Sequence, residues 1–382
     1  MRTLAAIVAA GSVLGLLGLA ADTTHRDVGS ILRERWPTWV GDKDSVQATD
    51  LDEEAGNPAL RNDDAAACAA LIQTVQWASR KQQLTQVPRN RLIDPGDPAF
   101  VKVLENSYKA GLRKQAAIPT ELWATDAPHF AAVTQSGDRT GDCWLMAPTG
   151  WMVKNRPGVV KSVVTPLGDG RYRVTFPSKV VVDVGVPTQT ELLAVNALPT
   201  LKDGLWLPVI KEAMGEVLGE RNPKKATIES QSLRLNGGSL ARMMEHWTGH
   251  RTQTTRLVGK APADEVRAKI IDALARKALI GAGTNKDPGG NIPPNHAYAI
   301  FGFDADHDMV ITWNPWHNDF TPKGPSNREN GYARKKGVAE IPLADFVQIF
   351  NALQIETDQP FDASAPRKRV EPAQPDPAAA TR

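Results

Sequence analysis

The chain has 382 residues, of which 41% are hydrophobic and 23% are charged, and its formal net charge is +2. This length allows one large or two ordinary domains with a sizeable core, and the composition is that of a soluble globular protein. The small net charge and the scattered basic residues favour neither nucleic acid nor an acidic membrane surface as a partner.

The N-terminus has the pattern of a secretory signal peptide. Met1-Arg2 is followed by an apolar run from Leu4 to Leu19 and by small residues before Ala21. We therefore expect residues 1–20 to be removed and the protein to be exported, either to the periplasm or outside the cell. The run is short for a membrane span, which needs about 20 residues, so an uncleaved membrane anchor is the alternative. After cleavage we expect no membrane span.

Residues 21–117 are predicted to form a mainly helical N-terminal extension with irregular parts. The segment from Asp22 to about Asn62 is predicted to be irregular, because its only strongly apolar point is Trp36-Pro37-Thr38-Trp39. Two helices are predicted, each opened by aspartate: Ala65–Arg80 after Asp63-Asp64, and a helix from Asp97-Pro98 to about Arg113. This extension is a pro-segment, a packing element or a partner-binding part, and its residues do not choose between these.

Residues 118–355 mix helical and strand patterns and are predicted to form one α+β unit. Apolar residues recur at helical spacing over Trp144–Val153, Leu205–Leu218, Leu240–Trp247, Asp264–Leu279 and Leu343–Leu353. Strand-like runs cover Val159–Leu167, Arg171–Phe176, Val180–Val184, Ala297–Phe303 and Met309–Trp313. The last two runs are predicted to form a hairpin after a glycine- and proline-rich loop, Gly281–Asn295. The Pro/Ala-rich tail in residues 356–382, from about Asp358, is predicted to be disordered.

One of the two cysteines, Cys143, lies where a polar, glycine-containing turn meets an apolar helical segment. At the start of a helix, the dipole and the unpaired backbone N–H groups stabilise a thiolate. Cys68 lies in an apolar helical context, which is typical of a small buried side chain. In an exported protein the two could instead form a disulfide, and that bond would abolish a thiol site.

A reactive cysteine needs a histidine and a group that orients the histidine, and the distal hairpin offers both. His296 precedes its first strand and Asn314 follows its second. If the turn centres near Asp304–Asp306, antiparallel pairing places His296 roughly opposite Asn314. The order and the chemistry match a Cys–His–Asn site.

The hairpin turn also carries alternating carboxylates, Asp304, Asp306 and Asp308, as a calcium loop does. Met309 and Pro315 replace the glycine and the glutamate that such a loop requires, so we predict a polar turn. We expect no metal ligands and no required cofactor, and the sequence leaves calcium dependence open.

Taken together, these motifs resemble the calpain family of cysteine peptidases over roughly Ala131 to Leu353. Gly141-Asp142-Cys143-Trp144-Leu145 is similar to the family's nucleophile signature, Asn295-His296-Ala297-Tyr298 to its histidine motif, and Asn314-Pro315-Trp316 to its asparagine motif. Further landmarks of the family are similar to Gly168–Val174, Leu205–Ala213 and Asp345–Phe350.

The resemblance implies a papain-like core of two subdomains, a helical half with Cys143 and a β-sheet half with His296 and Asn314. It implies Cys143 as the nucleophile, His296 as its proton partner and Asn314 as the acceptor that fixes the imidazole tautomer. Trp316 would shield that hydrogen bond, and Gln135 with the Cys143 N–H would form the oxyanion hole. The implied activity is endopeptidase cleavage of a protein or peptide substrate through a thioester acyl-enzyme.

Three departures from the family pattern keep other functions open. Gln135 lies two residues further from Cys143 than the family's oxyanion glutamine, as though residues were inserted in Ser136–Thr140. Pro148 falls inside the predicted helix, and His317 stands where a glycine commonly follows the asparagine motif. The alternative is a catalytically degenerate relative that acts as a protein-binding module. A third hypothesis is an acyl-transferring thiol enzyme such as a transglutaminase, which usually has an aspartate in the third place.

Overall fold

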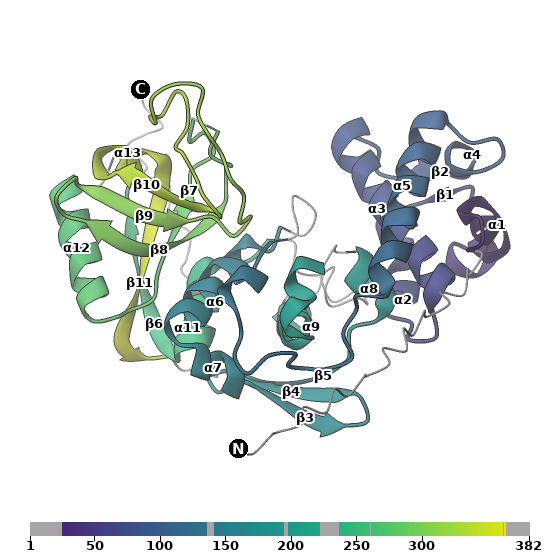
Figure 1. Cartoon of the computed structure of the whole chain (residues 1–382), viewed down its shortest axis with the longest axis horizontal. Coiled ribbons are helices and arrows are strands. Elements are labelled where there is room, and N and C mark those ends of the chain that lie inside the picture. The colour runs from purple at the N-terminus through teal and green to yellow at the C-terminus, as the bar shows by residue number, and fades with distance from the viewer. Residues whose placement is uncertain are drawn as a thin grey trace, which may run out of the picture.

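The computed structural model describes residues 25–135, 141–194, 198–221, 237–259, 261–289, 291–361 and 363. Figure 1 shows a mixed helix and sheet protein in which helices near the N-terminus, a central helical region and a larger sheet follow one another along the long axis. The predicted signal peptide and residues 364–382 of the predicted tail lie outside the described residues. Within the described ranges, the structure contains no helix long and apolar enough to cross a membrane.

The N-terminal helices are α1 (Val28–Trp39), α3 (Asn62–Gln82) and α5 (Pro98–Gln115), together with the short elements η1 (Ala48–Leu51), α2 (Asp52–Ala55), α4 (Arg89–Leu92) and the β1–β2 pair (Ser45–Val46, Val87–Pro88). They share one core, to which α8 (Gln189–Ala194) adds Leu193 and Ala194. The Gln73 side chain of α3 ties α8 to this core by donating to the carbonyl of Leu193 at 2.7 Å.

Two predictions for this region needed correction. The segment after Asp22 is not irregular, because α1 buries Val28, Ile31, Leu32, Trp36 and Trp39 on one face. Those positions follow the helical period, which the Trp-Pro-Thr-Trp sequence obscures. The helix α3 begins at Asn62, so Asp63 and Asp64 lie in its first turn and do not cap it. The prediction for α5 is confirmed, since the Asp97 side chain accepts from the Ala99 N–H.

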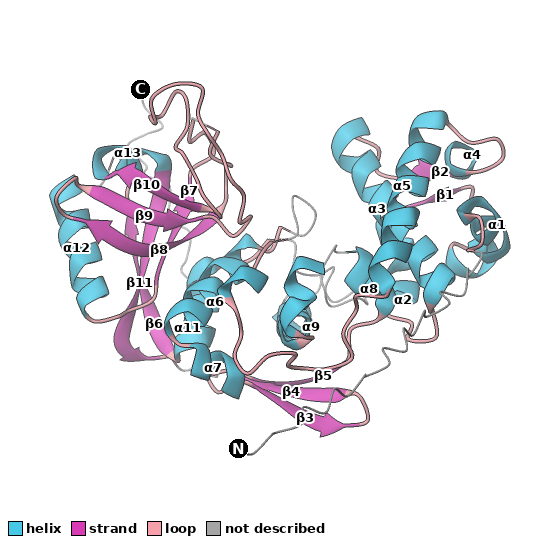
Figure 2. Cartoon of the chain, viewed as in Figure 1, coloured by secondary structure: helices cyan, strands magenta, loops and turns pink. Residues whose placement is uncertain are grey.

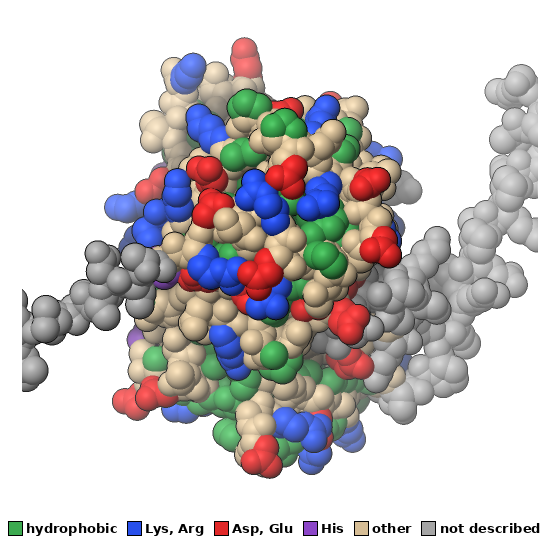
Figure 3. Space-filling view, turned by 90° about the vertical axis from the view of Figure 1, so that its right-hand side faces the viewer, with side chains coloured by type: hydrophobic (Ala, Val, Ile, Leu, Met, Phe, Trp, Pro, Cys, Tyr) green, Lys and Arg blue, Asp and Glu red, His purple; other side chains and the backbone are tan. Residues whose placement is uncertain are grey.

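The exposed side of the N-terminal helices carries both signs of charge. Figure 3 shows acidic and basic side chains interspersed over this face. Exposed ion pairs in the N-terminal helical region include Arg33 with Asp94 at 2.7 Å and Lys109 with Glu105 at 3.3 Å. Such pairs contribute little to stability individually.

The central region contains α6 (Cys143–Asn155), α7 (Pro157–Ser162), α9 (Trp206–Arg221), α11 (Leu240–Thr248) and the short helices η2 (Phe130–Ala132) and η4 (Leu198–Asp203). An antiparallel sheet of β3 (Val164–Gly168), β4 (Arg171–Thr175) and β5 (Val181–Gly185) lies beside these helices (Figure 2). The strand predicted over Val159–Leu167 is therefore wrong in its first half. Pro157 at the first helical position starts α7 there, and the strand begins only at Val164.

The larger sheet has six antiparallel strands in the order β10-β9-β8-β7-β11-β6. They are β6 (His250–Arg256), β7 (Ile280–Thr284), β8 (Ala297–Asp304), β9 (Met309–Trp313), β10 (Val338–Pro342) and β11 (Phe350–Pro360). Helices α12 (Ala263–Ala275) and α13 (Leu343–Ile349) pack on one face, and α6 and α11 pack on the other. Alternate residues of β8 enter the two cores, with Ala297 and Ala299 toward α6, and Tyr298 and Ile300 toward α12.

The hairpin of β8 and β9 is confirmed, but four neighbouring predictions are wrong in part. The helix predicted to reach Leu279 ends at Ala275, and the loop predicted from Gly281 begins after strand β7. The helix predicted over Leu343–Leu353 ends at Ile349, where the chain enters β11. That strand lies between β7 and β6 and runs to Pro360, past the expected start of the disordered tail.

A buried carboxylate on β11 joins α6 to the sheet. Glu356 accepts from Arg156, just after α6, at 3.1 and 2.9 Å, from the Leu279 N–H at 2.7 Å, and contacts His250 Nδ1 at 2.9 Å. Burial alone would raise the pKa of Glu356, but these hydrogen bonds lower it below the usual glutamate value. The charged form of Glu356 therefore stabilises the contact that positions α6.

Candidate active site

The helix α6 places Cys143 at its first residue, and every residue from Trp144 to Val153 is buried. Gly150 permits this close packing, because a Cβ there would lie 2.3 Å from the ring of Trp313 on β9. The helix continues through Pro148, so this proline does not end it. Beside the proline, the Thr149 hydroxyl donates a hydrogen bond to the backbone carbonyl of Leu145, one turn earlier in α6, at 2.7 Å.

Both cysteines are free thiols, and they belong to different cores. Cys68 is fully buried among the N-terminal helices, whereas Cys143 is half-buried at the edge of the central core. The disulfide alternative is therefore wrong for this structure.

The surroundings of the Cys143 thiol shift its pKa in both directions. Burial raises the pKa of Cys143, and the neighbouring Asp142 carboxylate raises it further. Hydrogen bonds from the backbone N–H groups of Ala297, Trp144 and Cys143 itself lower it, but the net pKa lies above the ordinary value. A thiolate at this position therefore needs a neighbouring base to take the proton.

His296 immediately precedes Ala297, whose backbone N–H hydrogen bonds to the Cys143 thiol, so the start of β8 lies against the start of α6. His296 is 5% exposed and precedes β8. Thr284, at the end of β7, fixes its backbone: the Thr284 hydroxyl accepts from the His296 N–H at 2.8 Å, and the Thr284 N–H donates to the His296 carbonyl at 2.9 Å. The hydroxyl also donates to the carbonyl of Pro293 at 2.7 Å.

Asn314 lies immediately after β9 and is fully buried. The register pairs Ala299 with Trp313, so continuing it by one residue places Asn314 level with Tyr298, two residues from His296. The side chain spans that offset, and Asn314 Oδ1 lies 2.9 Å from His296 Nε2. The same oxygen accepts from the Trp316 N–H at 2.9 Å. Because this oxygen only accepts, Nε2 carries the hydrogen, and Nδ1 is the nitrogen of the neutral ring that can accept a proton.

Trp316 packs against the imidazole of this pair, and His317 follows it in the chain. The Trp316 ring lies 4.8 Å from the His296 ring, centroid to centroid. His317 has a φ of +54°, the left-handed region in which glycine is the usual residue. His317 therefore departs from the family pattern by adopting a backbone conformation that glycine adopts most readily. Burial lowers the pKa of the His317 imidazole.

Gln135 lies against the same turn. Its backbone N–H donates to the carbonyl of Pro315 at 2.7 Å, and the residue is 5% exposed. Its side-chain oxygen has no hydrogen-bond partner among the described residues. The inserted residues of Ser136–Thr140, which would have to bulge, lie outside the described residues. The structure thus brings Gln135, His296, Asn314 and Trp316 together, and the Cys143 thiol lies against Ala297, the residue after His296.

Sequence reasoning assigned no role to several residues around this site. Tyr298 was part of the histidine motif, and its buried hydroxyl accepts from the Asn314 amide at 3.4 Å. Burial raises the pKa of Tyr298, and the nearby Arg334 guanidinium opposes that shift. The sequence does not indicate a role for Thr284, because its hydroxyl hydrogen bonds to His296 on the far side of a loop and no local sequence pattern signals that contact.

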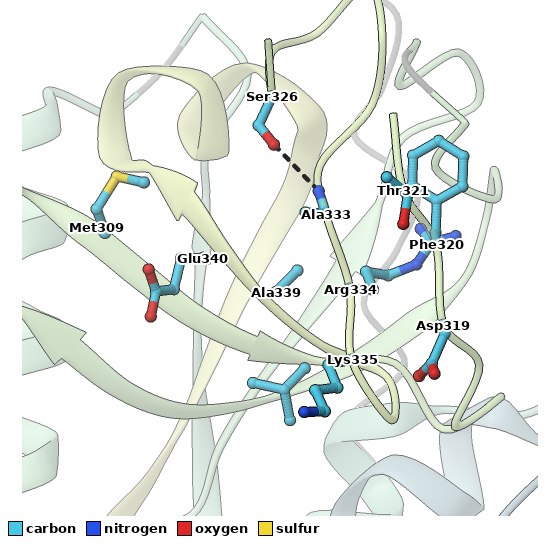
Figure 4. A pocket seen from close by; sticks show the side chains of 11 residues that line it. Met309, Asp319, Phe320, Thr321, Ser326, Ala333, Arg334, Lys335, Ala339 and Glu340 are labelled. Atoms are coloured by element: carbon cyan, nitrogen blue, oxygen red, sulfur yellow. Dashed lines mark hydrogen bonds between the residues drawn. The ribbon is translucent and has the colours of Figure 1, made fainter. Parts of the chain in front are cut away.

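A pocket of about 630 Å³ lies beside the edge strand β10. Arg334 lines it and lies over the ring of Phe320, while the Ser326 hydroxyl accepts from the Ala333 N–H at 3.2 Å (Figure 4). None of the five predicted site residues lines this pocket.

The hairpin turn is polar, as predicted. Asp304 Oδ1 accepts from the N–H groups of Asp306 and His307, and Asp308 pairs with Arg267. Across the ranges that the structure describes, no cluster of three or more His, Cys, Asp or Glu side chains is arranged to hold a metal ion.

A thiol at the start of a buried helix, and a histidine that is hydrogen-bonded to an asparagine just before the strand packed against that helix, are the side chains that cysteine hydrolases use. A model of the calpain family cysteine proteases matches residues 119–330, more than half of the chain, and the protein belongs to this family. No curated protein matches the chain.

Proposed function

We propose that this protein is an exported calpain-like cysteine endopeptidase that uses Cys143, His296 and Asn314. The family supports a cysteine peptidase that acts on proteins. The hydrogen bond between His296 Nε2 and Asn314 Oδ1 carries the proposal, because it fixes the tautomer in which Nδ1 is the nitrogen that can accept the thiol proton. In this proposal the core has two papain-like halves, with the thiol on the helical one and the imidazole on the sheet.

The first half of the reaction acylates the enzyme. His296 takes the proton of Cys143, and the thiolate attacks the peptide carbonyl carbon, forming a C–S bond and an oxyanion. Gln135 and the N–H of Cys143 stabilise this oxyanion; a donor of this kind contributes about 10²–10³ in rate. When the C–N bond breaks, His296 gives its proton to the leaving amine and a thioester remains.

Water then hydrolyses the thioester. His296 accepts a proton from the water as its oxygen bonds to the acyl carbon, and the C–S bond breaks to release the acid and the thiolate. Asn314 holds the imidazole in one tautomer throughout, and Trp316 keeps water away from the hydrogen bond between them.

The burial that raises the pKa of Cys143 favours a second candidate, a degenerate relative that binds proteins without cleaving them. The altered spacing of Gln135 points the same way. Both candidates agree with the family and with the fold.

Cleavage of labelled casein by the purified full chain distinguishes the two. The matched variants are Cys143→Ala and Cys68→Ala, since both remove a thiol but only the first alters the site. The endopeptidase predicts new amine ends that Cys143→Ala abolishes and Cys68→Ala preserves. Equal cleavage by wild type and Cys143→Ala, or new isopeptide bonds instead of amine ends, would contradict it.

A further inference from the structure

The residue before the nucleophile forms a buried ion pair with a distant helix. Asp142 has no exposed surface, and Lys211, in the first half of α9, is 2% exposed. Lys211 Nζ lies 2.7 Å from Asp142 Oδ2. Because burying two charges is costly even when they pair, such a pair calls for a specific reason.

The pairing keeps the Asp142 carboxylate away from the start of α6. Asp142 occupies the N-cap position, where an aspartate side chain usually accepts from the backbone N–H groups of the first turn. Here the side chain makes no such bond, and the Asp142 backbone carbonyl accepts from Leu145 and Met146 instead. The N–H groups of Cys143 and Trp144 hydrogen bond with the thiol.

The pairing also matters for charge. The titratable groups that interact with the Cys143 thiol include Asp142 from its own segment and Tyr298 from the start of β8, and His296 lies two residues before Tyr298. Asp142 is the anion among them, and a negative charge within a few ångströms opposes a thiolate. The ammonium of Lys211 lies directly against that anion and offsets its field.

We propose that Lys211 is a positioning residue for the reaction of Cys143. It holds the Asp142 carboxylate off the N–H groups at the start of α6 and neutralises its charge, so that these groups serve the thiolate and the oxyanion. The proposal rests on the proposed peptidase function. It assigns Lys211 no contact with the substrate.

The test measures the rate at which iodoacetamide alkylates Cys143 as a function of pH in the full chain. Four proteins are compared: wild type, Lys211→Met, Asp142→Asn, and the double variant Asp142→Asn/Lys211→Met. Lys211→Met removes the cation that offsets the Asp142 charge, so the pH midpoint of alkylation should rise by up to about 1–3 units, the size of shift that a neighbouring opposite charge produces. The double variant removes both charges and should return the midpoint toward the wild-type value. Asp142→Asn leaves the cation alone and should lower the midpoint below that of the double variant.

Thermal unfolding of each variant checks that it is folded. If Lys211→Met does not fold, the alkylation midpoints of Asp142→Asn and the double variant are compared instead. The proposal predicts the lower midpoint for Asp142→Asn, and equal midpoints in the two variants overturn it. A midpoint in folded Lys211→Met equal to the wild-type midpoint also overturns it, as does a double variant shifted as far as Lys211→Met. Failure of the peptidase function is recognised separately, because wild type would then lack the low-pH reaction that His296 supports.

Discussion

Replacing Asn314 with alanine should weaken both the fold and the site. Asn314 Oδ1 accepts two hydrogen bonds, from His296 Nε2 and the Trp316 N–H, both at 2.9 Å, in a fully buried position. Asn314→Ala leaves both donors without this acceptor. Each unsatisfied buried donor costs about 1–3 kcal/mol, so the loss of the acceptor for both donors should lower the free energy of unfolding by about 2–6 kcal/mol.

The same change should slow catalysis through the imidazole. Without the acceptor the ring is free to adopt either tautomer and to rotate, and misplaced general acid–base catalysis costs on the order of 10²-fold in kcat. Urea unfolding measures the first effect, and cleavage of labelled casein measures the second.

Thr312→Val provides the matched control. Thr312 lies two residues earlier on β9, is equally buried, and donates to the carbonyl of Ala339 at 3.2 Å. Its loss should lower stability by about 1 kcal/mol and leave kcat near the wild-type value. The reasoning is refuted if Asn314→Ala keeps wild-type kcat, or if Thr312→Val reduces kcat as much as Asn314→Ala does.

Two further substitutions test the contacts that position the site. Because hydrogen bonds lower the pKa of Glu356 in the folded state, its contribution is present above the unfolded pKa of about 4.3 and is lost as the pH falls through the folded pKa. Glu356→Gln should therefore lower the unfolding free energy at neutral pH by about 3 kcal/mol and flatten its fall on acidification; the exposed Asp183→Asn should change it far less, and a similar loss in both would contradict the account. Gly337→Ala should destabilise by about 1–3 kcal/mol in thermal unfolding, because φ is +80° and the new Cβ would lie 2.4 Å from the Asn314 carbonyl oxygen. Gly185→Ala, where nothing lies within 4 Å, should be neutral, and equal melting temperatures for the two would refute this.

The sequence predicts best those elements whose apolar period and ends are both local. The helix α5 has its capping aspartate and proline in sequence, and the β8–β9 hairpin has its strands and polar turn side by side. In contrast, Phe350–Pro360 was interpreted in part as the end of a helix. Its strand conformation depends on two neighbours, β7 and β6, that are distant in sequence.

The candidate site shows the same division. Cys143, His296 and Asn314 lie in recognisable motifs, so their residue types and order point to one another. Lys211 and Thr284 act through single contacts across the fold, and neither carries a local signal. Their part in the site is visible only once the chain has folded.

The central claim is that His296 acts as a base toward Cys143, and the alkylation rate of Cys143 tests it most directly. Wild type and His296→Ala are treated with iodoacetamide from about pH 4 to about pH 9, and mass spectrometry locates the modified residue. The account predicts fast modification of wild type near pH 5–6 that is lost in His296→Ala. Slow modification of both proteins that rises only near the ordinary thiol pKa of about 8.5, or above it, would contradict the claim.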